Sequence, residues 1–156
     1  MNRFLRVSLG LAALVLSACA SHKSESVETP TVLTATADVN PDVGGRPSPI
    51  VVRVFQLRGD AEFAKADFFA LYGHETETLG SSLVGVEEFV LRPGEKRDAR
   101  LVMAADTRYV AAIAAFRDIN TTQWRNVQTR PHRHLFTKER VTIGVSRASL
   151  SLMVKR

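Results

Sequence analysis

Apolar residues alternate with polar residues through much of this chain, and that period of two restricts its fold more than any other feature. Near the end of the chain, every second position is apolar: Val141, Ile143 and Val145, then, after a turn, Leu150, Leu152 and Val154. Successive side chains of a β-strand point to opposite faces, so this pattern predicts strands with one buried face. The two closing segments are therefore expected to form a hairpin.

Further strands are predicted at residues 31–39, 50–57, 83–91, 96–103, 109–116 and 124–128. Segments 50–57 and 109–116 are apolar at nearly every position, which favours central strands buried on both faces. Segment 96–103 alternates charged and apolar residues after the turn Arg92-Pro93-Gly94-Glu95, so it is expected to be the hairpin partner of 83–91. About eight strands, mostly antiparallel, indicate an all-β chain with a two-sheet β-sandwich and a short helical insertion.

The helical insertion is predicted between residues 61 and 73. Asp60 is expected to cap a helix over 61–66, and Asp67 a second helical turn that ends at Gly73. Large apolar side chains gather here: Phe63, Phe68, Phe69, Leu71 and Tyr72. Two interpretations remain open: a helix packed on the edge of a sheet, or rings that line a ligand pocket.

The N-terminus has the composition of a lipoprotein signal peptide. Arg3 and Arg6 precede an apolar run, Val7–Leu16, which is far shorter than the roughly 20 residues needed to cross a bilayer. The run leads into Leu16-Ser17-Ala18-Cys19, a sequence similar to the bacterial lipobox. Residues 1–18 are thus predicted to be removed and Cys19 to carry a covalent lipid; an ordinary secreted protein is the alternative.

After Cys19 the chain is polar and serine-rich up to Pro30, so residues 19–30 are predicted to form an acylated, flexible tether and residues 31–156 the folded domain. No Asp follows Cys19, which favours the outer membrane over the inner one. Loss of residues 1–18 lowers the formal net charge from +5 to +3, a mild excess that argues against nucleic acid as a partner. Cys19 is the only cysteine, so no internal disulfide forms.

No arrangement of residues in the sequence matches a catalytic motif. His132 and His134 lie two positions apart and would share one face of a strand, but a third metal ligand is not evident. The prediction is therefore a protein with no catalytic residues, no metal and no cofactor other than the lipid on Cys19.

The connection between the first two predicted strands is rich in proline and glycine. It consists of Asn40, Pro41, Asp42, Val43, Gly44, Gly45, Arg46, Pro47, Ser48 and Pro49. Three prolines fix φ and make the segment stiff, and loops of this length often carry function. The opposite charges of Asp42 and Arg46 are expected near its tip.

Several of these segments, taken in order, resemble one family. The resemblance rests on the lipobox, on Asn40-Pro41-Asp42, on Gly45 to Leu57, on Phe63 and the stretch Ala66 to Tyr72, and further on Leu79-Gly80, Leu91 to Glu95 and Ala115-Phe116-Arg117-Asp118. Together they are similar to TssJ, the outer-membrane lipoprotein family of the type VI secretion system. The likeness spans nearly all of the chain after Cys19 and is weakest after Trp124.

The resemblance implies a transthyretin-like β-sandwich that is not an enzyme and that lies, lipid-anchored, on the periplasmic face of the outer membrane. It implies binding of the periplasmic C-terminal region of the inner-membrane protein TssM, with TssL completing the complex. In this family the loop between the first two strands is the main TssM-contacting element, here Asn40 to Pro49. The alternative hypothesis is a periplasmic lipoprotein of the same fold that carries a small ligand.

Overall fold

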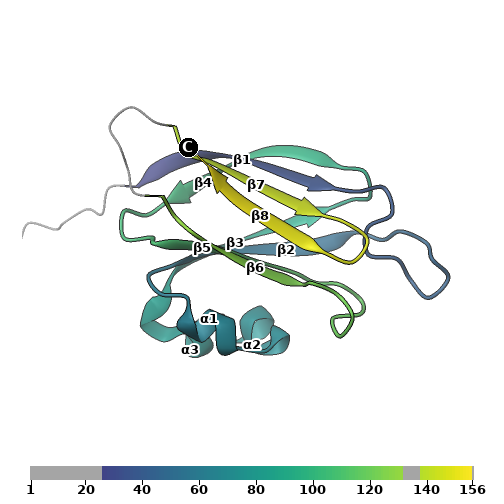
Figure 1. Ribbon diagram of the computed structural model, residues 1–156, viewed down its shortest axis with the longest axis horizontal. Coiled ribbons are helices and arrows are strands. Elements are labelled where there is room, and N and C mark those ends of the chain that lie inside the picture. Colours follow the sequence, from purple (N-terminus) through teal and green to yellow (C-terminus); the bar gives the residue numbers. More distant parts are fainter. Residues whose placement is uncertain (1–25, 132–137, 156) are drawn as a thin grey trace, which may run out of the picture.

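A computed structural model describes residues 26–131 and 138–155, and these form a β-sandwich with three short helices (Figure 1). The strands are β1 Val27–Ala35, β2 Ile50–Leu57, β3 Leu83–Leu91, β4 Lys96–Met103, β5 Tyr109–Ala114, β6 Arg125–Thr129, β7 Arg140–Val145 and β8 Leu150–Lys155. The predicted all-β sandwich with a helical insertion is confirmed.

The strands form two four-stranded sheets. Sheet A has the order β4-β1-β7-β8 and sheet B the order β3-β2-β5-β6, so β2 and β5 are central, as their continuous apolar sequences predicted. β7 and β8 form the expected antiparallel hairpin. β1 and β7 pair in parallel, whereas the other neighbours pair antiparallel.

The predicted hairpin between β3 and β4 is wrong, because the two strands belong to different sheets. The turn residues do behave as expected: Gly94 has a φ of 76°, and the backbone N–H of Arg92 donates to the Glu95 carboxylate at 2.8 Å. The turn, however, carries the chain from sheet B to sheet A. Leu91 before it and Leu101 after it are both buried in the core between the sheets, and an alternating strand satisfies that core equally well in either sheet.

Inward-facing side chains of both sheets form the main hydrophobic core. Its largest members come from all four strands of sheet A and from β2, β3 and β5 of sheet B, among them Leu33, Ile50, Leu91, Leu101, Met103, Ile143 and Leu152. Burial of these apolar surfaces supplies the main driving force for folding. The core holds the two sheets together and gives each connecting loop a rigid base.

The first strand begins at Val27, four residues earlier than predicted, so the expected tether up to Pro30 is too long. Thr29 and Thr31 are buried on the same face as Leu33, and residues 27–34 pair with β4. Threonine is a good strand former despite its hydroxyl group. Because threonine is polar, the buried face of this strand could not be recognised from the sequence.

Helices α1 Ala61–Lys65, α2 Phe68–Gly73 and α3 Glu75–Leu79, followed by the 3-10 turn η1 Gly80–Ser82, cover the outer face of sheet B. The Asp67 carboxylate caps α2 by accepting from the Ala70 N–H at 2.9 Å, as predicted. Asp60 makes no side-chain cap, contrary to expectation. Helix α3 extends the helical insertion beyond Gly73, where it was predicted to end.

A second hydrophobic cluster lies between these helices and sheet B. Phe63, Phe68 and Leu71 are buried against Phe55 and Ile113, and Phe68 meets Trp124 edge to face. These rings therefore belong to a packed core, as the first interpretation held, but the helices cover the outer face of sheet B and not its edge. Phe69 is exposed, and Tyr72 stacks on Phe68 with part of its ring exposed.

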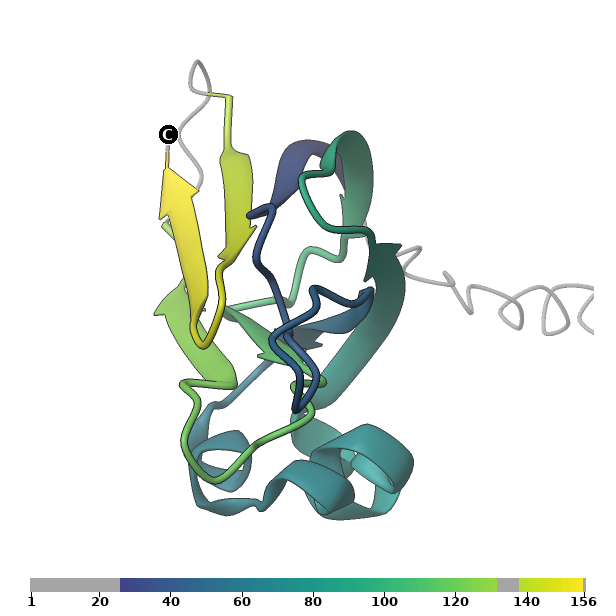
Figure 2. The same ribbon diagram turned by 90° about the vertical axis from the view of Figure 1, so that its right-hand side faces the viewer.

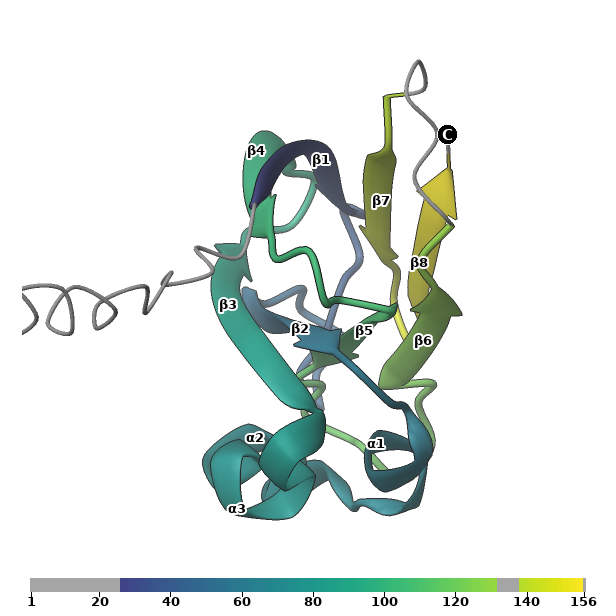
Figure 3. The ribbon, with the colours of Figure 1, turned by 90° about the vertical axis from the view of Figure 1, so that its left-hand side faces the viewer.

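The sandwich has two distinct ends. Four connections meet at one end, here called the loop end: residues 36–49, 92–95, 115–124 and 146–149 (Figure 2). At the opposite end, here called the basal end, β1 begins and β8 ends (Figure 3). The described chain thus starts at one end of the sandwich and presents the predicted docking loop at the other.

Candidate docking loop and groove

The base of the loop formed by residues 40–49 is fixed by a buried asparagine. Asn40 has a φ of 47°, a left-handed conformation that asparagine tolerates better than most residues. Its Nδ2 donates to the Pro49 carbonyl at 3.0 Å, and its Oδ1 accepts from the Arg117 N–H at 2.8 Å. The Ser48 N–H closes the neck of the loop on the Val39 carbonyl at 3.1 Å. One side chain therefore joins both ends of the loop to the segment that follows β5.

The tip of the loop is ordered by Asp42. Its Oδ1 accepts from the N–H groups of Gly44 and Arg46, both at 2.9 Å, and its Oδ2 accepts from Arg46 Nε at 3.1 Å. The Arg46 backbone N–H is the main reason that the pKa of the Asp42 carboxyl lies below its ordinary value. Gly45 turns the chain with a φ of 80°. The tip thus holds its shape through contacts within the loop.

These contacts change the interpretation of the two opposite charges. The two charges do lie at the tip, as expected, but the oxygens of Asp42 are committed to Gly44 and Arg46. The Arg46 side chain keeps 84% of its surface exposed, and Val43 is fully exposed beside it. An exposed valine next to an exposed guanidinium is the part of the loop that a partner would meet first.

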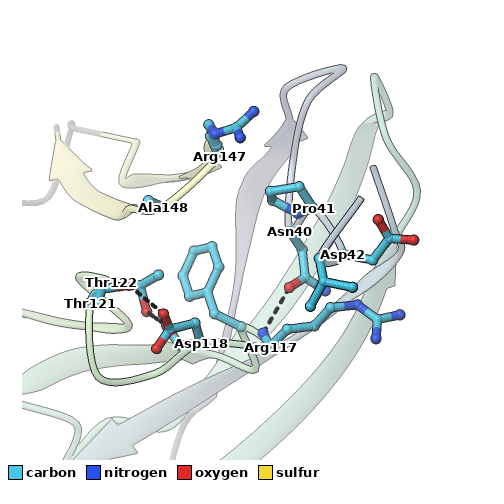
Figure 4. Close-up of a pocket in the computed structure, with 11 residues that line it drawn as sticks. Asn40, Pro41, Asp42, Arg117, Asp118, Thr121, Thr122, Arg147 and Ala148 are labelled. Atoms are coloured by element: carbon cyan, nitrogen blue, oxygen red, sulfur yellow. Dashed lines mark hydrogen bonds between the residues drawn. The ribbon is translucent and has the colours of Figure 1, made fainter. Parts of the chain in front are cut away.

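A groove of about 490 Å³ lies beside the loop (Figure 4). It is lined by Asn40, Pro41, Asp42 and Val43 of the loop, by Phe116, Arg117, Asp118, Thr121 and Thr122 after β5, and by Arg147 and Ala148 between β7 and β8. The groove therefore joins three segments that are far apart in the sequence. At the loop end, the projecting loop and the adjacent hollow of the groove form one continuous surface.

The groove is lined by charges of both signs, Arg117 and Arg147 together with Asp42 and Asp118. The Asp118 carboxylate is used locally: Oδ2 accepts from the Thr121 hydroxyl at 2.7 Å and Oδ1 from the Asn120 N–H at 3.1 Å. The Thr121 bond is the main cause of the lowered pKa of Asp118. Arg117 and Arg147 are exposed, and neither forms an ion pair with another residue of 26–131 or 138–155. The groove therefore presents two guanidinium groups next to the Asp118 carboxylate, and the Arg117 guanidinium already donates to Ser48 Oγ at 3.3 Å.

Not all ten predicted partner-binding residues are accessible. Asn40 and Ser48 are buried and support the loop, whereas Val43 to Pro47 are exposed. The residues after β5 and between β7 and β8 were not predicted as part of a site. The polar pair Arg117-Asp118, directly after a buried strand, was the available signal. Cys19, His132 and His134 lie outside the described residues.

Among residues 26–131 and 138–155, no group of three or more His, Cys, Asp or Glu side chains is placed to hold a metal ion. Within the same ranges, every helix falls short of the length and apolar character that a membrane span requires. A stiff loop beside a groove is suited to binding another macromolecule.

Comparison with known proteins gives a consistent family match. Residues 28–148 match the sequence family described as type VI secretion lipoprotein, with the member names VasD, EvfM and TssJ. A search of curated proteins gives no significant match.

Solved structures show the same fold. The lipoprotein TssJ1 of the type VI secretion system from Pseudomonas aeruginosa is 30% identical, with a TM-score of 0.77 over 85% of this chain and 98% of that one. Lip from Serratia marcescens, a membrane-bound component of the type VI secretion system, is 30% identical, with a TM-score of 0.72 over 82% and 97%. A chain from a structure titled for the TssM C-terminal domain from EAEC is 23% identical, with a TM-score of 0.66 over 81% and 98%, a likeness of fold alone.

Proposed function

Because this chain belongs to the type VI secretion lipoprotein family, we propose that it is the outer-membrane lipoprotein of such a system and docks the periplasmic C-terminal region of TssM. It is anchored through a lipid on Cys19 and has no enzymatic activity. Loop 40–49 and the adjacent groove form the docking surface. TssL joins the complex through TssM.

The observation that carries this proposal is the preorganised loop at the end of the sandwich opposite the start of β1. β1 has nine residues, and at about 3.3 Å per residue it spans roughly 30 Å. A chain held at its N-terminus by a membrane can therefore present the loop end well away from that membrane. This arrangement suits a subunit that reaches a partner standing in the periplasm.

The order of the loop favours binding. The Asp42 contacts and three prolines fix the backbone before a partner arrives, so little conformational entropy is lost on association. Arg46 and Arg117 can each make bidentate bonds to a carboxylate. The occurrence of this fold in the structure titled for the TssM C-terminal domain agrees with the proposed partner.

Replacement of residues 42–47 by a Gly-Ser segment tests the docking surface. Ser48 is kept because it is buried at the neck of the loop. The variant should lose the exposed Val43 and Arg46 contacts and the fixed backbone, and its affinity for the TssM periplasmic region should fall at least tenfold, or about 1.4 kcal/mol. Calorimetric titration measures the change.

The pair Val43→Asp and Val102→Asp provides the matched control. Both valines are exposed, but Val43 lies in the loop and Val102 on β4 near the basal end. Only Val43→Asp should weaken binding. Unchanged affinity in a folded loop variant, or equal losses in the two valine variants, would show that the docking surface lies elsewhere.

A further inference from the structure

The outer face of sheet A carries a row of cations at the basal end. Arg140 of β7 and Lys155 of β8 are directly opposite each other in the antiparallel pair, and both are exposed. Like charges in this position repel and weaken a sheet. Within residues 26–131 and 138–155, neither side chain forms an ion pair that would relieve this repulsion.

The row continues across the sheet. Val141 pairs with Thr31, which places Arg140 beside Pro30 of β1, and Pro30 in turn pairs with Arg100 of β4. Arg100 meets Glu28 at 2.7 Å, an ion pair that is exposed on both sides and therefore weak. Three cations thus face outward across sheet A, with Glu28 close to only one of them.

Exposed apolar side chains flank this row. Val102, opposite Glu28, has 53% of its surface exposed, and Met153, opposite Thr142, has 48% exposed. We name the set formed by Arg100, Val102, Arg140, Met153 and Lys155 the basal patch. Basic residues combined with exposed apolar ones are typical of surfaces that rest on an anionic bilayer.

The start of the described chain lies at the same end. Val27 follows Cys19 by only eight positions, so a lipid on Cys19 would keep the first residue of β1 within roughly 28 Å of the bilayer surface. Attraction between exposed charges and a membrane decays over about 8 Å at physiological ionic strength. A tether this short lets the basal patch come within that distance of the lipid headgroups. It also makes binding of the patch to the headgroups effectively intramolecular, so a weak contact suffices.

We propose that the basal patch binds the anionic phospholipid headgroups of the membrane that holds the lipid anchor, and so orients the domain with loop 40–49 pointing into the periplasm. The proposal rests on the anchor of the proposed function. It gives a function to the pair of Arg140 and Lys155, whose repulsion destabilises the sheet and which has no part in docking through the loop.

Energy transfer to labelled lipid headgroups tests this orientation. The mature acylated protein is reconstituted in vesicles of phosphatidylcholine with or without phosphatidylglycerol. A fluorophore is placed at Ala105→Cys, in the connection between β4 and β5 at the basal end, or at Val43→Cys, in the docking loop. Phosphatidylglycerol should raise the energy transfer from position 105. At position 43 the transfer should fall or stay low. Arg140→Glu with Lys155→Glu should abolish the difference, as should high salt.

Arg46→Glu with Arg147→Glu is the matched control, because it reverses two exposed charges at the loop end. It should leave the lipid dependence intact. The energy transfer could instead stay the same with and without phosphatidylglycerol and after the basal charge reversal, in protein that still floats with the vesicles. That result would overturn the proposed lipid contact and leave the lipid anchor standing. Failure to float would overturn the anchor as well. Sedimentation with purified peptidoglycan that depends on Arg140 and Lys155, with unchanged energy transfer, would assign the patch to the cell wall instead.

Discussion

The base and the tip of loop 40–49 are held in shape by different interactions. At the base, Asn40 and Ser48 are buried, and Asn40 bonds to Pro49 at the other end of the loop and to Arg117 beyond it. At the tip, Asp42 bonds only within the loop, and Val43 and Arg46 are exposed. The base belongs to the fold, and the tip belongs to the surface. Changes at the base should therefore act on stability, and changes at the tip on local shape and binding.

Asn40→Ala should give the largest effect on stability. The substitution removes two hydrogen bonds, leaves the Arg117 N–H without its acceptor and places alanine at a φ of 47°. The expected loss is about 3 kcal/mol in the free energy of unfolding, measured by urea denaturation. Asn40→Gly accepts the same φ and should lose clearly less. Equal losses for the two variants would show that backbone conformation plays no part at the base.

Gly45→Ala should have a smaller effect. A Cβ at position 45 meets no atom within 4 Å, so its cost comes only from the positive φ of 80°. We expect a loss of about 1 kcal/mol in the free energy of unfolding, measured in the same denaturation experiment. Gly73→Ala is the control, since that position has equal space without a positive φ. A neutral Gly45→Ala would mean that the tip adopts another conformation at no cost.

Asp42→Ala should change global stability least and local order most. The amides of Gly44 and Arg46 lose their acceptor and should exchange with deuterium faster, while the midpoint of thermal unfolding stays nearly constant. Because the pKa of Asp42 is lowered in the folded protein, its contribution is present above its unfolded pKa of 3.8 and is lost as the pH falls through the folded value. The same amides of the unsubstituted protein should therefore lose protection only below about pH 4. Equal amide protection in Asp42→Ala at neutral pH would contradict this role.

Sequence patterns located the strands well because burial on one face leaves a direct trace. Ile143 and Leu152 alternate with exposed neighbours in both pattern and structure, and the capping role of Asp67 was equally visible. The start of β1 was placed too late because Thr29 and Thr31 are buried despite their hydroxyl groups. Local polarity alone does not report which side a threonine faces.

Features that depend on tertiary contacts were out of reach. The turn at residues 92–95 has the same composition whether it closes a hairpin or crosses between sheets, so β3 and β4 were paired wrongly. The groove joins Pro41, Arg117 and Arg147 from three connections, and no short-range pattern relates them. Likewise, the sequence placed Asp42 and Arg46 near the tip but did not show that they bond to each other, because that contact depends on how the tip folds.

The parallel pairing of β1 with β7 sets an order of assembly for the whole domain. β1 is an interior strand of sheet A, but its partners β4 and β7 begin at Lys96 and Arg140, far along the chain. Contacts between such distant segments form late and slow folding. A chain that crosses a membrane with its N-terminus first would have β1 available long before β7 and β8 emerge. In such a chain, sheet A would stay open, with unpaired backbone groups on β1, until nearly the last residue had crossed. Folding would then follow translocation instead of accompanying it.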